Sequence, residues 1–412
     1  NDAFTAQPIL GVKVKTADGI YYTNNKGEFV FQKQPNSIEL SHPDYLTMVV
    51  PLQADKNQVE NQQIGKDVSI EVVIRLEPNS QTEEETVVSA NRSQEKRKDV
   101  AQKIQVMRAG EIQFQQQTSM ADVLAQSGSI FVQKSQLGGG SPMIRGFATN
   151  RVLMVVDGVR MNNAIYRSGN LQNIISIDPL TLEGAEVVFG PGSLIYGSDA
   201  IGGVMDFHTI TPAFAESKKL QFKGSSTLRY ATANKENTFH TDFNLSKGRW
   251  AFVSSFTYSK YDDLKMGVHG PDAYLRNEYV ERINNIDSII SNNNRRIQRF
   301  SGYEQLNLLQ KVRYRLNDNM DLTYSFTYAG TGEAPRYDRL IQYRNNKLRF
   351  AEWSYGPMLW RMHSLTLTDN KKRMLSDGAR LVIGYQNYAE SRIDRTRSTT
   401  TRNIQSESVE AY

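Results

Sequence analysis

The sequence predicts a mainly β protein with three parts: a small β-sandwich, an α+β domain, and long antiparallel strands of the transmembrane-barrel type. Three observations lead to this fold class. Residues 1–77 alternate short strand-forming runs with turns such as Asp18-Gly19. Residues 101–212 mix extended runs with helical ones. From about Lys219 onward, apolar and polar residues alternate, and tyrosine (20) and phenylalanine (17) are plentiful in the whole chain.

Composition limits the function classes. The chain has 412 residues, of which 39% are hydrophobic, and no apolar run approaches the roughly 18 residues that a membrane helix requires. A membrane role is therefore possible only through a β-barrel. Cysteine is absent, which excludes disulfides and thiolate metal sites. The net charge of +5 comes from Lys and Arg dispersed among Asp and Glu, so we expect no nucleic-acid partner.

Residues 1–77 form the first predicted unit. The segments G-V-K-V, T-N-N-K-G-E-F-V-F and S-I-E-L-S-H-P-D-Y resemble, in this order, the β-sandwich called the carboxypeptidase regulatory-like domain. That resemblance implies a further strand before Ile9, so the first strand of the sandwich is expected to be missing here. No zinc-binding H-E-x-x-H occurs, so no protease is implied. The unit is either a periplasmic accessory domain or an inert spacer. Its candidate strands are Ile9–Lys15, Tyr21–Thr23, Glu28–Gln32, Ser37–Ser41, Thr47–Pro51 and Val68–Leu76.

Residues 78–100 are polar and charged, which predicts a linker. The linker contains a small apolar island at residues 85–90, E-T-V-V-S-A. A short β-prone stretch in a flexible tether offers backbone groups for strand addition by a partner. The island is alternatively the first strand of the domain that follows.

Residues 101–212 form the α+β domain. Ala101–Met107 is a predicted strand, and Glu111–Gln126 forms one or two helical pieces with Thr118 or Ser119 as N-cap. The segments I-R-G-F, L-M-V-V-D-G-V-R and V-F-G-P-G-S-L-I-Y-G-S-D-A-I-G-G follow between Ile144 and Gly203. A soluble domain with a phosphate loop is disfavoured, because no G-x-x-x-x-G-K-[ST] is present.

These three segments resemble, in order and spacing, the plug domain of TonB-dependent outer-membrane receptors, and the resemblance covers roughly Glu85 to the end of the chain. It implies a plug at 101–212 and the first part of a barrel at 213–412, in the outer membrane of a Gram-negative bacterium with residues 1–100 in the periplasm. The island resembles the TonB box, which pairs with the energy-transducing protein TonB and its inner-membrane motor complex. The implied TonB contacts are Glu85, Thr86, Val87, Val88, Ser89 and Ala90.

The barrel interpretation also rests on the residues themselves. In D-L-T-Y-S-F-T-Y, the apolar side chains of Leu322, Tyr324, Phe326 and Tyr328 share one parity, which suits outer-membrane lipid on one face and a polar lumen on the other. Long connections at 261–299 and 330–349 alternate with short turns, as a barrel predicts; a soluble β-sandwich has no reason for that asymmetry. About eight strands are expected before Tyr412, against about 22 in plugged transporters, so further strands are expected beyond it.

Candidate ligand contacts lie in the polar loop between Asp157 and Ile174, which the resemblance implies is an apex facing the extracellular cavity. Ordinary loop solvation is the alternative. His269, in a long barrel connection, is a further candidate. Arg145 is flanked by apolar residues and is expected to pair with a carboxylate, tying the plug to the barrel rather than touching ligand. The apex candidates are Asn162, Asn163, Tyr166, Arg167 and Asn170.

The expected function is import of a scarce iron-containing ligand, haem or a ferric siderophore, as cargo and without an intrinsic cofactor or protein-bound metal. G-E-A-P-R-Y-D-R-L followed by E-W-S-Y-G-P is similar to the haem branch of these receptors. Haem needs an axial donor, and no histidine lies in the apex loop, which leaves Tyr166 or His269. The alternatives are cobalamin, peptide or glycan import, or a non-transporting surface barrel. A surface lipoprotein or haem-carrier protein is a further possible partner, and no enzymatic activity is expected.

Overall fold

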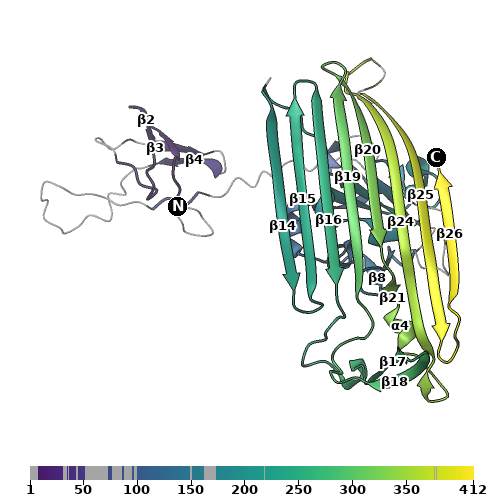
Figure 1. Ribbon diagram of the computed structural model, residues 1–412. Coiled ribbons are helices and arrows are strands. Elements are labelled where there is room, and N and C mark those ends of the chain that lie inside the picture. Colours follow the sequence, from purple (N-terminus) through teal and green to yellow (C-terminus); the bar gives the residue numbers. More distant parts are fainter. Residues whose placement is uncertain are drawn as a thin grey trace, which may run out of the picture. The chain divides into compact units, whose positions relative to one another are not determined.

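The computed structural model describes residues 8–30, 35, 37–42, 45–51, 73–76, 86–87, 95–96, 100–148, 151–161, 173–217, 219–374, 376 and 378–412 (Figure 1). The chain divides into two compact units, Asn1–Glu85 and Thr86–Tyr412. Each unit is considered separately below. None of the helices within the described ranges has the length and hydropathy needed to cross a membrane.

The described part of the first unit is an antiparallel sheet in the order β2-β1-β3-β4. Its small core forms because alternate side chains turn to one face, as Val14 of β1 and Ile38 and Leu40 of β3 do. The predicted strand at Glu28–Gln32 does not form over residues 28–30, and residues 31–32 lie outside the described ranges. The strands are β1 (Lys13–Lys15), β2 (Ile20–Tyr22), β3 (Ser37–His42) and β4 (Tyr45–Pro51).

The predicted plug segments form a five-stranded sheet in the order β11-β10-β13-β12-β7. β10 and β13 pair in parallel at its centre, and the other neighbours are antiparallel. All of β10 is buried, which explains its continuous V-L-M-V-V. The tight turn after β10 has positive φ at Asp157 (52°) and Gly158 (91°). The strands are β7 (Lys103–Arg108), β10 (Val152–Val156), β11 (Val159–Arg160), β12 (Leu182–Phe189) and β13 (Gly203–Thr209).

Two short helices, α1 (Ala109–Gln115) and α2 (Met120–Gln126), follow β7 as the sequence predicts. Ser119 caps α2, because its side chain accepts a hydrogen bond from the backbone N–H of Asp122. The pair β8 (Phe131–Gln133) and β9 (Ser141–Met143) completes the segment before I-R-G-F. Smaller elements are the 3₁₀ helices η3 (Asn173–Ser176) and η4 (Pro179–Thr181) and the helix α3 (Ser193–Tyr196).

Eight long strands form an antiparallel wall in the order β14-β15-β16-β19-β20-β24-β25-β26. This matches the expected number, and the plug strands lie behind the wall in the view of Figure 1. The wall strands are β14 (Gln221–Ala231), β15 (Glu236–Lys247), β16 (Trp250–Tyr261), β19 (Tyr303–Arg315), β20 (Met320–Thr331), β24 (Phe350–Asp369), β25 (Ala379–Thr396) and β26 (Asn403–Ala411).

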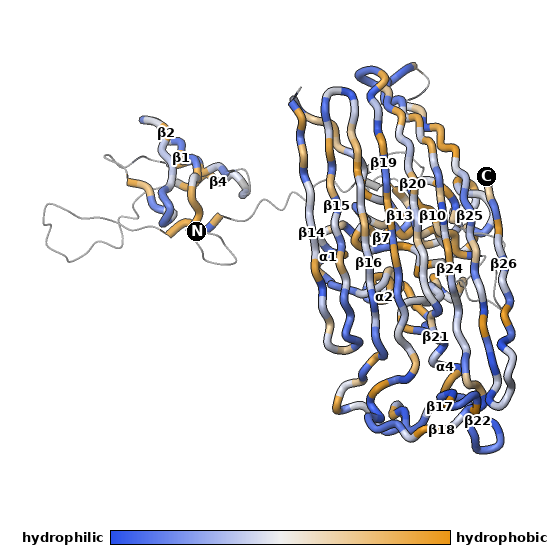
Figure 2. The backbone as a smooth tube through the Cα atoms, viewed as in Figure 1, coloured by the Kyte–Doolittle hydropathy of each residue, from blue (hydrophilic) through white to orange (hydrophobic). Residues whose placement is uncertain are grey.

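The alternation expected for a barrel wall is present. On β16, alternate residues from Ala251 to Ser259 are buried, whereas Trp250, Phe252 and Tyr258 on the other face are exposed. Small and hydroxyl side chains therefore face the plug and aromatic ones face outward. Figure 2 shows the orange of the hydrophobic plug strands β7, β10 and β13 behind a wall of mixed colour.

The long connections all leave the wall at one end. Residues 262–302 and 332–349 lie at this end, which we call the rim, and the turns at 248–249 and 316–319 lie at the other. The rim carries a hairpin of β17 (Glu278–Ile283) and β18 (Ile286–Ser291), together with η5 (Asp272–Tyr274). It also carries β21 (Ala334–Pro335), α4 (Tyr337–Leu340), β22 (Tyr343–Arg344) and β23 (Lys347–Leu348).

Candidate ligand-binding site

Side chains of the wall hold the plug mainly by donating hydrogen bonds to main-chain carbonyls of the plug. Gln305 and Gln386 donate from their Nε2 atoms to the carbonyls of Ile175 and Arg160, each at 2.7 Å. Buried carbonyls that no plug strand satisfies thereby find partners on the wall. The remaining contacts of this kind are Arg229 to Gln117, Tyr261 to Thr118, Lys311 to Thr209, Arg313 to Pro212 and Arg380 to Asp157.

One ion pair accompanies these contacts, between Lys311 of β19 and Asp157 of the plug at 3.0 Å. Asp157 also accepts hydrogen bonds from the backbone N–H (2.9 Å) and hydroxyl (2.6 Å) of Thr209. Burial alone would raise the pKa of Asp157, but Lys311 and Thr209 together outweigh it and hold the pKa below its ordinary value. The charged carboxylate therefore fixes the ends of β10 and β13 to the wall.

At the rim, the two segments G-E-A-P-R-Y-D-R-L and E-W-S-Y-G-P pack together. β21 pairs with β24, and the Arg336 guanidinium lies 4.7 Å from the Trp353 ring and 5.3 Å from the Tyr355 ring. Asp338 holds the other edge of that guanidinium at 2.6 Å. Trp353 and Tyr355 share a core with Ile175 of the plug. Leu340 of α4 belongs to the same core, so α4 packs with the plug residue Ile175, and the single charge of Arg336 is already paired with Asp338.

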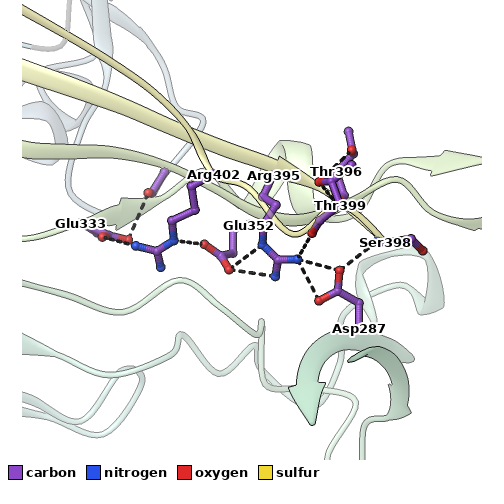
Figure 3. Close-up of polar contacts among 9 residues, drawn as sticks. Asp287, Glu333, Glu352, Arg395, Thr396, Ser398, Thr399 and Arg402 are labelled. Carbon is purple, nitrogen blue, oxygen red and sulfur yellow. Dashed lines mark hydrogen bonds and ion pairs between the residues drawn. The ribbon is translucent and has the colours of Figure 1, made fainter. Parts of the chain in front are cut away.

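A chain of ion pairs crosses the rim from Glu333 through Arg402, Glu352 and Arg395 to Asp287 (Figure 3). The Arg395 guanidinium contacts Asp287 of β18 at 2.6 Å and Glu352 of β24 at 2.8 Å. Glu352 also accepts a hydrogen bond from Arg402 Nε at 2.6 Å, and Arg402 Nη1 lies 3.5 Å from Glu333. We call these five residues the rim network. They connect four separate segments, so the β17–β18 hairpin is tied to the wall.

The Asp287–Arg395 pair is the least solvated part of the rim network, because each side chain is only 2% exposed. Burial acts to raise the pKa of Asp287, but hydrogen bonds from Arg395 and from the backbone N–H of Ser398 (2.9 Å) outweigh it and lower the pKa. Asp287 is therefore ionised at neutral pH and holds the hairpin against the turn at 397–402.

Next to the rim network lies a pocket of about 860 Å³, within the size range of small-molecule sites. Its lining crosses the strand ends: Tyr261 and Tyr303 come from the plug-facing side of the wall, and Lys260 and Glu304 from the outward side. Acidic and basic side chains occur in similar numbers, so the pocket has polar character without one dominant charge.

Of the predicted site residues, the structure describes His269 and Arg145 but not the apex candidates. His269 is exposed in the 262–302 connection. Arg145 is also exposed, with φ 49°, and its guanidinium lies over the ring of Phe189, a plug residue, at 5.8 Å. Among the described residues it makes no ion pair, so the expected carboxylate is not found there, and its contact with the barrel stays a prediction. The apex candidates Asn162, Asn163, Tyr166, Arg167 and Asn170 lie outside the described residues.

The described part of the predicted TonB box is β5 (Thr86–Val87), which pairs with β6 (Glu95–Lys96). It does not join the plug sheet. Glu85, Val88, Ser89 and Ala90 lie outside the described residues. The alternative of a first plug strand is therefore not favoured for Thr86 and Val87.

Sequence reasoning missed the residues that organise the rim. Asp287 and Arg395 stand 108 positions apart, and neither belongs to a recognisable motif. Arg336 and Trp353 lie in the two segments G-E-A-P-R-Y-D-R-L and E-W-S-Y-G-P, but their contact depends on the pairing of β21 with β24. Within the described ranges, no group of three or more His, Asp or Glu side chains is arranged to hold a metal ion.

Comparison with known proteins agrees with this architecture. Residues 96–204 match the TonB-dependent Receptor Plug Domain. The vitamin B12 transporter BtuB of Vibrio vulnificus (strain CMCP6) is 37% identical over 172 residues, which are 41% of this chain and 27% of that protein. The copper transporter OprC superposes with a TM-score of 0.54 at 14% identity, over 70% of this chain and 38% of that one. A double mutant of the Serratia marcescens hemophore receptor HasR, in complex with its hemophore HasA and heme, gives 0.52 at 17% identity, over 72% and 39%.

A plug sheet seated on the inner face of an antiparallel wall defines an outer-membrane receptor with a plugged barrel. Together with the match of residues 96–204 to the plug domain, this architecture supports a TonB-dependent outer-membrane receptor. The chain spans about a quarter of the length of the curated relative and about two fifths of the two superposed structures.

Proposed function

We propose that the chain is part of a transporter that imports a bulky metal chelate, haem or a ferric siderophore, with energy from TonB. The observation that carries the proposal is the plug domain held on the inner face of the wall, beneath a rim with a pocket of about 860 Å³. A transporter needs a closure that can move and an outer site that selects cargo. Binding at the rim side then shifts the plug between two states, provided that cargo binds one of them more tightly.

Coupling to TonB is assigned to residues 85–90. Two of them, Thr86 and Val87, already have strand geometry, which suits addition of a partner strand. In this proposal residues 1–100 lie in the periplasm, and the exposed aromatic side chains of the wall, such as Trp250 and Phe252, meet outer-membrane lipid. A surface lipoprotein or haem-carrier protein is a further proposed partner. The plug is proposed to cover 101–212 and the barrel to begin at 213.

Cobalamin is the second candidate cargo. A vitamin B12 transporter is among the curated relatives, at 37% identity over 172 residues. The fold of this chain is similar both to a copper transporter and to a hemophore receptor, so the fold alone does not identify the cargo. The proposed contacts for any of them are the apex residues Asn162, Asn163, Tyr166, Arg167 and Asn170, together with His269.

Binding and uptake by the full-length receptor test the proposal. In detergent, the purified receptor is titrated with haem, ferric enterobactin and cyanocobalamin, following the Soret band for haem and intrinsic fluorescence for the others. Tyr166→Ala and His269→Ala are measured in parallel with haem, because either side chain could supply an axial ligand.

Uptake is compared between cells carrying the wild-type receptor and cells carrying a variant that lacks residues 85–90. Saturable binding of one probe, with uptake lost in the deletion variant, supports TonB-coupled import. Uptake that is unchanged by the deletion contradicts it. If cyanocobalamin is the one probe that binds, cobalamin replaces the iron chelates as the proposed cargo.

A further inference from the structure

Arg392 lies on the inner face of the wall, toward the rim. On β25 the plug-facing side chains alternate: Gln386 donates to the plug carbonyl of Arg160, and Tyr388 is buried in the core shared with the plug. Arg392 has the same parity and pairs across the strand with Tyr355, which is also plug-facing. At roughly 3.3 Å per residue, Arg392 stands about 20 Å beyond Gln386 along β25.

The Arg392 guanidinium lies over an aromatic ring and makes one long ion-pair contact, without a hydrogen bond among the described residues. It lies 5.2 Å from the Trp353 ring, and its side chain is 38% exposed. The closest carboxylate oxygen is Asp394 Oδ1, 3.8 Å from Nε, which is beyond hydrogen-bonding distance. Asp394 instead accepts a hydrogen bond from Asn403 Nδ2 at 3.1 Å. Among the described residues, Arg392 donates no hydrogen bond, and its Nε is buried without an acceptor.

The neighbouring arginines differ in this respect. Arg336, over the same indole, is bonded to Asp338 and to the Tyr355 hydroxyl. Arg395 and Arg402 are bonded to Glu352. The two strands that flank β25 lie within the described residues, and neither supplies a hydrogen-bond acceptor to Arg392.

We propose that Arg392 is a specificity-determining residue that binds an oxyanion of the cargo, a carboxylate or a catecholate. A guanidinium presents a planar set of donors that matches such groups in a bidentate way. Stacking on Trp353 fixes its plane before cargo arrives, which reduces the entropy lost on binding. The long contact with Asp394 is partly exposed and contributes little, so it leaves the donors available.

This inference rests on the proposed function, since it concerns the cargo of the same receptor. Haem carries propionate carboxylates, ferric enterobactin carries catecholate oxygens, and cyanocobalamin, neutral overall, carries neither. The three probes therefore separate the two proposed sources of an oxyanion from a cargo that lacks both.

The test measures dissociation constants of the full-length receptor in detergent for the three probes. Arg392→Gln removes the charge and keeps a planar amide, and Arg392→Lys keeps the charge without the planar donors. Arg361→Gln, an exposed arginine on β24, is the matched control. We expect Arg392→Gln to weaken the anionic probe that wild type binds by about 10- to 100-fold, with Arg392→Lys intermediate and the control within about twofold.

The outcomes are distinct. A loss confined to haem identifies a carboxylate contact, and a loss confined to ferric enterobactin identifies a catecholate contact. Equal affinity of wild type and Arg392→Gln for the anionic probe that binds overturns the anion contact and leaves the proposed function intact. Binding of cyanocobalamin alone overturns the iron-chelate cargo, and the carboxylate or catecholate contact with it. Binding of none of the probes overturns the proposed cargoes, and this assignment with them.

Discussion

Replacing Arg395 by methionine should release the β17–β18 hairpin from the wall. The substitution keeps a long apolar stem but leaves the Asp287 carboxylate, 2% exposed, without its cation. Removing one partner of a buried ion pair costs about 3–5 kcal/mol. We take the lower value, about 3 kcal/mol, because Arg395 also lines the rim pocket, which brings water close. At about 1.4 kcal/mol per factor of ten, opening of the hairpin becomes about 100-fold more frequent.

Amide hydrogen exchange of residues 279–290 in the full-length receptor is the assay, since it reports local opening. Arg402→Met is the matched control: its side chain is 47% exposed, so the loss is at most about 1 kcal/mol, or about fivefold. Adding Asp287→Asn to Arg395→Met removes the orphan charge and should restore part of the protection. If Arg395→Met and Arg402→Met accelerate exchange to within a factor of two of each other, the buried Asp287–Arg395 pair is not what holds the hairpin.

Acid should have the same effect as the substitution. The folded-state pKa of Asp287 is lowered, so its stabilisation is fully present above its ordinary pKa of about 3.9 and is lost as pH falls through the lowered value. Exchange in the hairpin, corrected for the intrinsic pH dependence, should stay level from pH 8 to pH 5. A rise that begins near pH 6 would assign the effect to another group.

Three further predictions concern the plug. Lys311→Met leaves Asp157 buried without its cation and should loosen the plug by about 3 kcal/mol, measured as faster exchange in β10 and β13, whereas Lys311→Arg should remain near wild type. Burial raises the pKa of Asp206 to about 6; the nearby His208 acts to lower it and Glu186 to raise it. The contribution of Asp206 to plug stability is therefore present below about pH 4 and is lost as pH rises through 6. Asp206→Asn should remove that pH dependence from urea unfolding of the plug. Gly138→Ala would drive a Cβ into the hydroxyl and the outer ring carbons of Tyr303 and should destabilise the plug by about 1–3 kcal/mol. Tyr303→Leu, which removes the outer ring atoms, should restore part of that loss, and no change in unfolding on Gly138→Ala would contradict the close approach.

The sequence predicts the elements of this protein better than their contacts. The β16 alternation is visible because each apolar or polar residue reports its own face, and Ser119 is identifiable as a cap from its position before M-A-D-V-L. Arg145 shows the limit: an arginine between apolar neighbours indicates an ion pair only if both neighbours are buried, and Phe147 is exposed. A stacking contact with Phe189, 44 positions away in a different strand, leaves no local trace.

The rim network was unpredictable for a related reason. Arg395 has the outward parity of β25 and would be assigned to solvent by periodicity, but the long 262–302 connection returns to cover it. Which loop covers which strand end depends on tertiary packing, and charged residues are so common in loops that their pairing cannot be inferred from position.

The grip of the wall on the plug has an evolutionary consequence. Wall side chains hold the carbonyls of Gln117, Ile175 and Arg160, and every residue type supplies a carbonyl. Substitutions at these plug positions leave the acceptors unchanged, so plug sequences can diverge without matching changes in the barrel. Asp157 is different, because its side chain must match Lys311. Recombination that exchanged a plug between related receptors would keep these hydrogen bonds and would be constrained where plug side chains matter, as at Asp157 against Lys311 and at Gly138 against Tyr303.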